Sequence, residues 1–267
     1  MILKLLERQT LTEHMKRQSD RGFIQNPNLP TGEVAAVAIS AEATKAINKL
    51  SSLGIDVALI NKNPLLPEPV ADHTDLQLLH LKHNRILISA EHLFTGDLKK
   101  NFDIQVIEEK LGSKYPNDVL LNCKIIGNNI VLNSRTIARE VLEFASTEGL
   151  NVIDVNQGYA GCSICVINES GIITDDESIY RAAQNFLNDV LFISKGSIRL
   201  KGYNYGFIGG CCGKISKTKL AVNGRIESHK DYKDITDFTA KHNVEIVELS
   251  DEPLTDIGGI IPLNVKV

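Results

Sequence analysis

The stretch Cys162–Ile193, CSICVINESGIITDDESIYRAAQNFLNDVLFI, contains a complete copy of the unit that decides the fold. Two apolar segments, Cys162–Ile167 and Gly171–Thr174, are separated by a short polar turn, which predicts a β-hairpin. The amphipathic pattern of Glu177–Leu187 predicts a helix, and Val190–Ile193 predicts a returning strand. The unit is therefore strand, strand, helix, strand.

The core of this unit recurs about every 40 to 50 residues, a period typical of arrays and propeller-like rings. We identify five copies of opening strand, helix and returning strand. They are Val34–Ile39, Ala41–Leu53 and Asp56–Ile60; Arg85–Ile88, Ala90–Asn101 and Ile104–Ile107; Asn129–Leu132, Arg135–Thr147 and Asn151–Val155; Gly171–Thr174, Glu177–Leu187 and Val190–Ile193; and Lys219–Val222, His229–Lys241 and Val244–Leu249. Ser134 or Asn133 is expected to cap the third helix.

A further strand, here called the third strand of each unit, precedes the next opening strand. The third strands are predicted at Asp72–Leu81, Asp118–Ile126, Cys162–Ile167, Phe207–Ile215 and Ile257–Val265. The last of them has no partner after it, and the opening strand at Val34 has none before it. Pairing of these two strands would close a ring without exposed sheet edges. A hairpin in every period, and no G-x-G-x-x-G opening a helix, disfavour a doubly wound dinucleotide-binding sheet.

Composition and charge exclude several classes of protein. The 267 residues carry 29 Lys and Arg against 33 Asp and Glu, a formal net charge of -4, so neither DNA nor an anionic membrane is an expected partner. No apolar run approaches the roughly 20 residues of a membrane-spanning helix, and Met1–Asp20 lacks the apolar core of a signal peptide. The odd number of cysteines is typical of free thiols in a reducing compartment, so we expect a cytoplasmic protein.

The repeat over Val34–Val267 resembles the pentein superfamily, as do the strings Gly206–Gly210 (GFIGG), Gly158–Ser163 (GYAGCS) and Ile173–Asp175 (ITD), which look like an uncharacterised bacterial branch of that fold. Penteins include arginine deiminase, dimethylarginine dimethylaminohydrolase, amidinotransferase and a ribosome anti-association factor. The resemblance implies an α/β class fold, a five-fold pseudosymmetric α/β-propeller closed by the C-terminal strand. It would form a single domain at 34–267 after an N-terminal extension at 1–33, which packs on the ring or mediates association.

In a pentein-like ring, the third strands and the loops before them would face the central channel. The matched positions are Asp72, His73, Asp75, Asp118, Asn122, Tyr159, Cys162, Asn204, Tyr205, Cys211 and Asp256. His73 and Asp75 are two residues apart on a predicted strand and would share one face, where the carboxylate can orient the imidazole for acid–base work. The alternative is a solvated turn.

Cys162 and Cys211 compete for the role of nucleophile, which needs a thiolate stabilised by His73 in its charged form. The alternative is that both are buried structural cysteines, the usual setting of a free thiol. The pentein hydrolases carry their nucleophile in the last unit, but Thr255–Pro262 contains no cysteine, so a nucleophile here has moved. The Cys162-x-x-Cys165 spacing on a strand disfavours a zinc site, and we expect no metal and no cofactor.

Together these features predict a cytosolic, cysteine-dependent, amidinohydrolase-like C–N bond hydrolase, or an amidinotransferase-like transferase. Its substrate would be a small amidine, amide or guanidino compound, because paired carboxylates bind a planar cation with charge-assisted hydrogen bonds. The residues expected to bind the substrate are Asp72, Asp118, Asn122, Tyr159, Asn204, Tyr205 and Asp256. Two alternatives stay open: a non-catalytic ring that binds a macromolecule such as the ribosome, and a small-molecule sensor that has lost turnover.

Overall fold

The structure is a computed structural model, and it describes residues 21–90 and 94–267. These residues form a mixed α/β fold of small sheets and short helices. Four sheets have three strands each, of which the first two are antiparallel and the last two parallel. Their strands are β4 (Leu78–Lys82), β5 (Arg85–Ile88) and β7 (Asp103–Val106); β8 (Lys124–Ile126), β9 (Asn129–Leu132) and β10 (Asn151–Asp154); β11 (Ile164–Asn168), β12 (Gly171–Thr174) and β13 (Asp189–Phe192); and β14 (Cys212–Ser216), β15 (Lys219–Val222) and β16 (Glu245–Glu248).

The fifth sheet joins strands from the two ends of the described chain. Strand β17 (Ile261–Lys266) pairs antiparallel with β2 (Val34–Ser40), which pairs in parallel with β3 (Asp56–Ile60). The predicted pairing of the C-terminal strand with the first opening strand is therefore confirmed. The sheet repeats the strand order of the other four and is extended at its edges by β1 (Arg21–Phe23) and β6 (Phe94–Thr95).

The described part of the predicted N-terminal extension packs on this framework. Beyond β1, Ile24 is buried in the hydrophobic cluster beside β2, and Leu29 packs against the cluster of the third and fourth units. The side-chain amide of Asn28 donates a hydrogen bond to the Ile125 carbonyl at 3.0 Å. The rest of the predicted extension, residues 1–20, lies outside the described residues.

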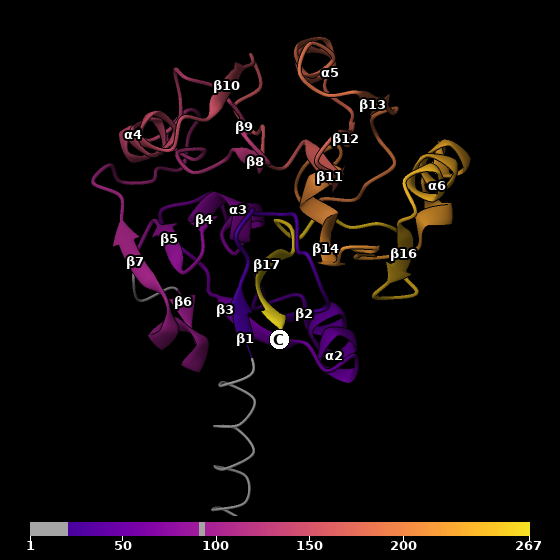
Figure 1. Cartoon of the computed structure of the whole chain (residues 1–267), viewed down its shortest axis with the longest axis horizontal. Coiled ribbons are helices and arrows are strands. Elements are labelled where there is room, and N and C mark those ends of the chain that lie inside the picture. Colours follow the sequence, from indigo (N-terminus) through magenta and orange to yellow (C-terminus); the bar gives the residue numbers. More distant parts are fainter. Residues whose placement is uncertain (1–20, 91–93) are drawn as a thin grey trace, which may run out of the picture.

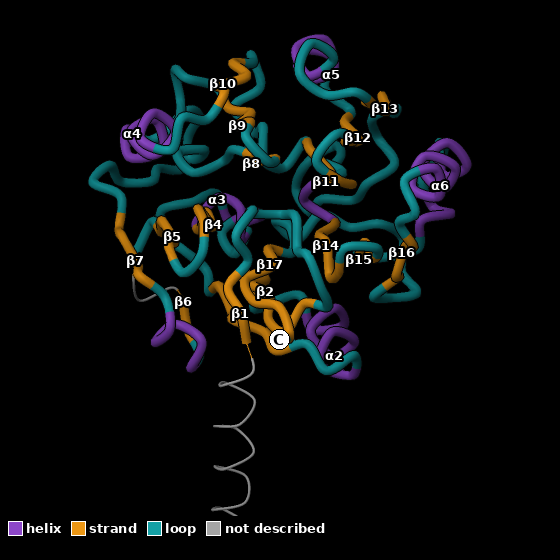
Figure 2. Tube along the Cα trace, viewed as in Figure 1, coloured by secondary structure: helices purple, strands orange, loops and turns teal. Residues whose placement is uncertain are grey.

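The units follow one another around a common centre, with the helices toward the outside (Figures 1 and 2). The outer helices are α2 (Thr44–Ser52), α4 (Arg139–Thr147), α5 (Glu177–Ala183) and α6 (Tyr232–Lys241). The strands therefore converge inward, and the turns that enter the third strands of different units meet near the centre.

The helix predicted at Ala90–Asn101 is wrong. Phe94 and Thr95 instead form β6 against β3, and Asp97–Asn101 forms a 3₁₀ helix, η3. Gly96 separates the two with a φ of 108°, which is incompatible with a continuous helix. Residues 91–93 lie outside the described part of the chain.

The predicted cap of the third helix is also wrong. Helix α4 begins after Ala138 without a side-chain cap, because Asn133 accepts a hydrogen bond from the Arg135 backbone in a turn that precedes the helix. The fourth helix has the cap that the sequence analysis missed: Asp176 accepts hydrogen bonds from the backbone N–H groups of Ser178 and Ile179.

The third strands are shorter than predicted at their inner ends. Thr74–Gln77 forms a one-turn helix, α3, and Gly209–Cys211 forms a 3₁₀ helix, η4. Backbone groups in these turns form hydrogen bonds between neighbouring units instead of along a strand. The Asp75 N–H donates to the Gly258 carbonyl at 3.0 Å, and the Gly210 N–H donates to the Cys162 backbone carbonyl at 3.0 Å. The inner turns therefore join the units to one another.

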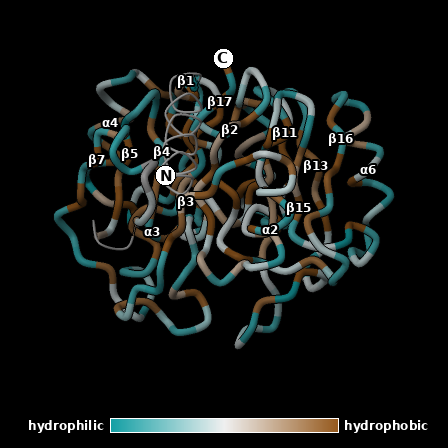
Figure 3. The backbone as a smooth tube through the Cα atoms, turned by 90° about the horizontal axis from the view of Figure 1, so that it is seen from below, coloured by the Kyte–Doolittle hydropathy of each residue, from teal (hydrophilic) through white to brown (hydrophobic). Residues whose placement is uncertain are grey.

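The core runs along the strands and between the units. All seven residues of β2 and all four of β12 are buried, and Figure 3 shows apolar stretches concentrated along the interior strands. Near-continuous apolar strands are expected where both faces of a sheet are covered. Among the described residues, no helix has the length and apolar character needed to cross a bilayer.

Candidate functional site

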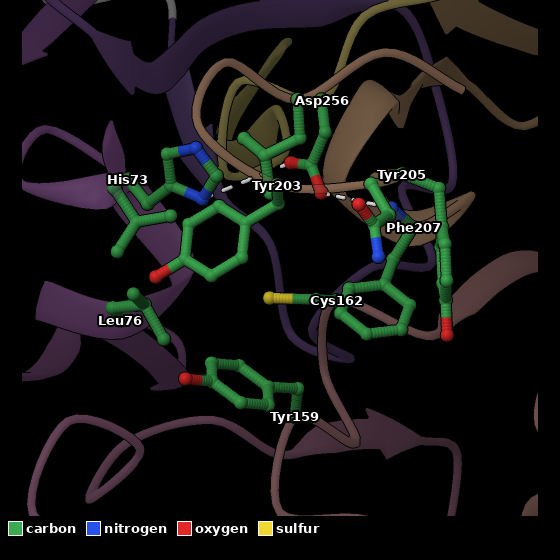
Figure 4. Close-up of a pocket in the computed structure, with 11 residues that line it drawn as sticks. His73, Leu76, Tyr159, Cys162, Tyr203, Tyr205, Phe207 and Asp256 are labelled. Carbon is green, nitrogen blue, oxygen red and sulfur yellow. Dashed lines mark hydrogen bonds and ion pairs between the residues drawn. The ribbon is translucent and has the colours of Figure 1, made fainter. Parts of the chain in front are cut away.

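The inner turns of four units enclose a cavity of about 240 Å³ (Figure 4). One side holds His73 and Asp256, which precede α3 and β17, and another holds Cys162, which precedes β11. The remaining lining residues are Val70, Leu76, Tyr159, Leu200, Tyr203, Asn204, Tyr205 and Phe207. The lining therefore combines a thiol, an imidazole and a carboxylate with a mostly aromatic and aliphatic wall.

The carboxylate of Asp256 is held by the backbone and faces His73. One oxygen accepts the Phe207 N–H at 2.9 Å and the other accepts the Gly258 N–H at 3.0 Å. His73 Nδ1 lies 3.7 Å from Asp256 Oδ1, and both side chains are buried. Burial raises the pKa of Asp256 above its ordinary value, against the opposing effect of His73.

This arrangement corrects the predicted geometry of His73 and Asp75. The two do not share a strand face, because His73 lies immediately before α3 and Asp75 in the first turn of that helix. The carboxylate that pairs with His73 is Asp256, from a distant part of the chain.

Glycines make room for this pair. A Cβ at Gly210 would overlap the Asp256 carboxylate, and a Cβ at Gly206 would overlap the Asp256 side chain. Gly258, with a φ of 74°, allows its turn to lie directly against the backbone of His73. The glycines of the GFIGG string are therefore explained by the fold, because the backbone passes close to the buried Asp256 carboxylate.

Asn122 orients the thiol of Cys162. Its side-chain amide donates to the Cys162 sulfur at 3.1 Å, and its carbonyl oxygen accepts the Cys162 backbone N–H at 3.1 Å. The same amide nitrogen donates to the Asp75 carbonyl at 3.1 Å. Figure 4 shows the sulfur pointing into the space between Tyr203 and Tyr159.

The charge around Cys162 is negative. Burial raises the pKa of the Cys162 thiol well above its ordinary value, and the carboxylates of Asp75 and Asp256 raise it further, while the Asn122 donor opposes them. Both oxygens of Asp75 are buried, and no described residue donates a well-formed hydrogen bond to them. The positive field expected beside the thiol is therefore not supplied by these neighbours.

Asp118 anchors the wall of the cavity. It is buried and accepts a hydrogen bond from the Tyr159 hydroxyl, which fixes the Tyr159 ring beside Cys162. Burial, followed by this bond, raises the pKa of Tyr159 above its ordinary value, so the phenol remains a hydrogen-bond donor.

The structure separates other predicted site residues from the cavity. Cys211 is fully buried in a hydrophobic cluster, where its thiol donates to the Ile208 carbonyl at 3.2 Å. Asp72 accepts a hydrogen bond from the Ser40 hydroxyl and does not line the cavity. Asn204 and Tyr205 do line it. Among the described residues, no group of His, Cys, Asp and Glu side chains is arranged to hold a metal ion.

Sequence reasoning missed several residues of the wall, chiefly Tyr203 and Phe207. Both lie in or beside the stretch Gly202–Gly206, in which glycines bracket tyrosine, asparagine and tyrosine. The sequence signal for this part of the wall is a predicted loop with aromatic residues between two glycines. In such a loop the rings are not packed into a helix or strand, so they are available to line a cavity.

Solved structures share this fold at low sequence identity. DDAH from Pseudomonas aeruginosa, complexed with citrulline, is 10% identical with a TM-score of 0.51, covering 88% of this chain and all of its own. Agmatine deiminase from C. jejuni with substrate bound is 11% identical (TM-score 0.53; 92% and 96% covered), and inosamine-phosphate amidinotransferase from Streptomyces griseus is 11% identical (TM-score 0.54; 89% and 94% covered). These proteins are members of the pentein superfamily, so the likeness confirms the predicted pentein fold.

Among curated proteins, no sequence matches this chain. A family model does match: that of DUF6873, described as a family of unknown function, over residues 38–261. The chain, with its pentein fold, belongs to the DUF6873 family.

Proposed function

We propose that this chain is a cysteine-dependent enzyme that breaks a C–N bond of a small amidine or guanidino compound. It would act as a hydrolase, or as a transferase where an amine replaces water. The observation that carries the proposal is the Cys162 sulfur, which Asn122 orients and which faces the same cavity as His73 and Asp256. The likeness in fold to a deiminase and an amidinotransferase supports this chemistry.

In the proposed architecture the five sheets are the blades of a five-fold pseudosymmetric α/β-propeller. Residues 34–267 form its single domain, and 1–33 form an extension. The equivalent strand order of the five sheets, with β17 completing the sheet of β2 and β3, supports this arrangement. The substrate then enters where the inner turns meet.

The substrate supplies the positive charge that the thiol lacks. The buried carboxylates beside Cys162 favour a cation in the cavity, and Asp256, which lines it, is the proposed partner of an amidinium or guanidinium head. Asp118 is proposed to act through Tyr159, whose hydroxyl it holds. A bound cation offsets the carboxylates that raise the pKa of Cys162. The empty site therefore keeps an inert thiol, and the occupied site favours the thiolate.

In the proposed mechanism, Cys162 transfers its proton to His73, and the thiolate attacks the amidinium carbon to form a C–S bond. Protonated His73 then gives the proton to the leaving nitrogen, the C–N bond breaks, and ammonia or an amine departs. Water gives a proton to His73 and adds to the same carbon. The C–S bond breaks, and the proton on His73 returns to Cys162.

An amidine-bearing alkylating agent tests the proposal without knowledge of the substrate. Native protein is treated with chloroacetamidine or with its neutral counterpart chloroacetamide, and each cysteine is read by peptide mass spectrometry. We expect Cys162 to react faster with the cation, whereas Cys211, which lies in the core, reacts with neither in the folded state. Equal rates with both reagents at Cys162 would contradict the proposed cation site.

Turnover is tested by ammonia release from a panel of amidines and guanidines. The Cys162→Ala variant should lose all release, and Cys211→Ala, the matched control, should keep it. Release that survives in Cys162→Ala would exclude this residue as the nucleophile.

A further inference from the structure

The cavity wall that continues from Cys162 is a row of aromatic rings. The rings of Tyr159 and Phe207 stack with centroids 6.0 Å apart and planes 24° apart, and Tyr205 meets Phe207 edge-on at 6.0 Å. Tyr203 faces Tyr159 from the other side of the Cys162 sulfur and is 46% exposed, so it stands at the mouth of the cavity. A flat ring or an apolar body fits between such faces, because aromatic rings attract rings in offset or edge-on geometry.

Among the described residues that line the cavity, none is Lys or Arg. His73 is the one lining side chain that can carry a positive charge, and it faces the Asp256 carboxylate. The Lys195 ammonium lies 6.0 Å from the centroid of the Tyr205 ring but is outside the lining and is 4.0 Å from the Asp176 carboxylate. A carboxylate or phosphate on the ligand would therefore lose its water beside apolar groups and near the buried Asp256 carboxylate, without a compensating cation.

The cavity is also small. Its volume of about 240 Å³ is below the roughly 300–1,000 Å³ usual for drug-sized ligands. It has room for a head group and one ring.

We infer that the substrate is an aryl-type cation: an amidine or guanidine whose body is a single flat or apolar ring and which carries no anionic group. This inference rests on the proposed function for the head group and adds the class of the body. It sets this site apart from one that holds an amino acid such as citrulline, the ligand in the DDAH structure. In the expected pose the head lies near Cys162 and Asp256, and the ring lies between Tyr203 and Tyr159.

The test is direct binding to the Cys162→Ala variant, which binds without turnover, by isothermal titration calorimetry. Four probes separate the parts of the ligand: benzamidine, acetamidine with the same head and no ring, 4-carboxybenzamidine with an added anion, and neutral benzamide. We expect benzamidine to bind at least about tenfold more tightly than each of the others, the equivalent of ~1.4 kcal/mol.

A second substitution keeps the test specific to the ring. Tyr203→Ala, made in the same Cys162→Ala background, should weaken benzamidine by about tenfold and leave acetamidine unchanged, because only the ring contacts this wall. Phe192→Ala is the matched control, since Phe192 is also 46% exposed and its ring contacts Tyr180 instead of the cavity. The control should bind benzamidine normally.

The outcomes separate the two proposals. If acetamidine or the carboxylated compound binds as tightly as benzamidine, the inference about the body is overturned while amidine binding stands. If benzamide binds as tightly as benzamidine, the ring preference is supported and the cation site of the proposed function fails. If none of the four compounds binds, both proposals are overturned.

Discussion

Replacing Asn122 with alanine should raise the pKa of the Cys162 thiol and slow its alkylation. The Asn122 amide is the one protein donor that the described residues aim at the sulfur, at 3.1 Å, and it lowers the pKa of the thiol. A hydrogen bond to a charged group is worth about 1.5–3 kcal/mol. At 1.36 kcal/mol per pKa unit, its loss should raise the pKa by about 1 to 2 units.

The expected change in rate follows from two opposing effects. Below the pKa, each unit of increase lowers the thiolate fraction about tenfold. The more basic thiolate is in turn about threefold more nucleophilic per unit, for a Brønsted coefficient of about 0.5. The net decrease in rate is therefore about threefold for one unit and about tenfold for two.

The assay is the second-order rate of iodoacetamide alkylation at Cys162, measured from pH 7 to about 10 by mass spectrometry of the Cys162 peptide. Asn133→Ala is the matched control, because Asn133 is also buried and bonds to the Asn156 carbonyl instead of a thiol. Circular dichroism checks that both variants remain folded. A folded Asn122→Ala protein whose Cys162 reacts at the wild-type rate, or an equal slowing in Asn133→Ala, would refute the reasoning.

Three other substitutions have effects that follow from the structure. Gly210→Ala should displace the Asp256 carboxylate. We expect it to lower the free energy of unfolding, measured in urea, by about 1–3 kcal/mol and to abolish any turnover. Tyr159→Phe removes the hydroxyl that donates to the buried Asp118 carboxylate, and should cost about 1–3 kcal/mol in the same measurement. Lys214 is 3% exposed, and burial lowers its pKa to about 8. Because the unfolded chain binds this proton up to its ordinary pKa of 10.5, wild-type stability should rise between pH 8 and 10.5 by up to about 3 kcal/mol relative to Lys214→Met.

Each of these has a matched control. A Cβ at Gly32 meets no atom within 4 Å, so Gly32→Ala should change stability by less than about 0.5 kcal/mol. Tyr180→Phe removes a phenol that has no hydrogen bond within the described part of the chain, and should be nearly neutral. Lys217→Met replaces an exposed neighbour of Lys214 and should keep the wild-type dependence of stability on pH. A loss in Tyr180→Phe as large as in Tyr159→Phe, or no difference between the two lysine variants above pH 8, would contradict these explanations.

The repeating part of the fold could be predicted because it depends on local patterns. The apolar runs of β11 and β12 and the polar turn between them are sufficient for a hairpin. The amphipathic segment before β13 is sufficient for a helix, although α5 ends at Ala183, earlier than predicted. The pairing of β17 with β2 was also predictable, since the repeat pattern left each of these two strands without an antiparallel partner from its own hairpin.

The inner turns could not be predicted in the same way, because their backbone partners come from other units. The backbone N–H of Asp75 bonds to the Gly258 carbonyl, and that of Gly210 bonds to the Cys162 carbonyl. Because the partners are far apart in the sequence, no local sequence pattern indicates these contacts. For this reason strand periodicity pairs His73 with Asp75, whereas the carboxylate beside His73 is Asp256. The identities of most lining residues were found by matching positions between repeats, and their pairing required the structure.

The pairing of β17 with β2 has a consequence for how the protein is made. A ribosome releases β2 and Cys162 well before Asp256 and β17, so a nascent chain that has not reached β17 has an open sheet edge and a thiol without the carboxylate across the cavity. Such long-range pairing also makes folding slow compared with local hairpins. Synthesis that stops early therefore yields a chain that is prone to aggregate but has no assembled site, and the site around Cys162 is complete only after β17 has paired with β2.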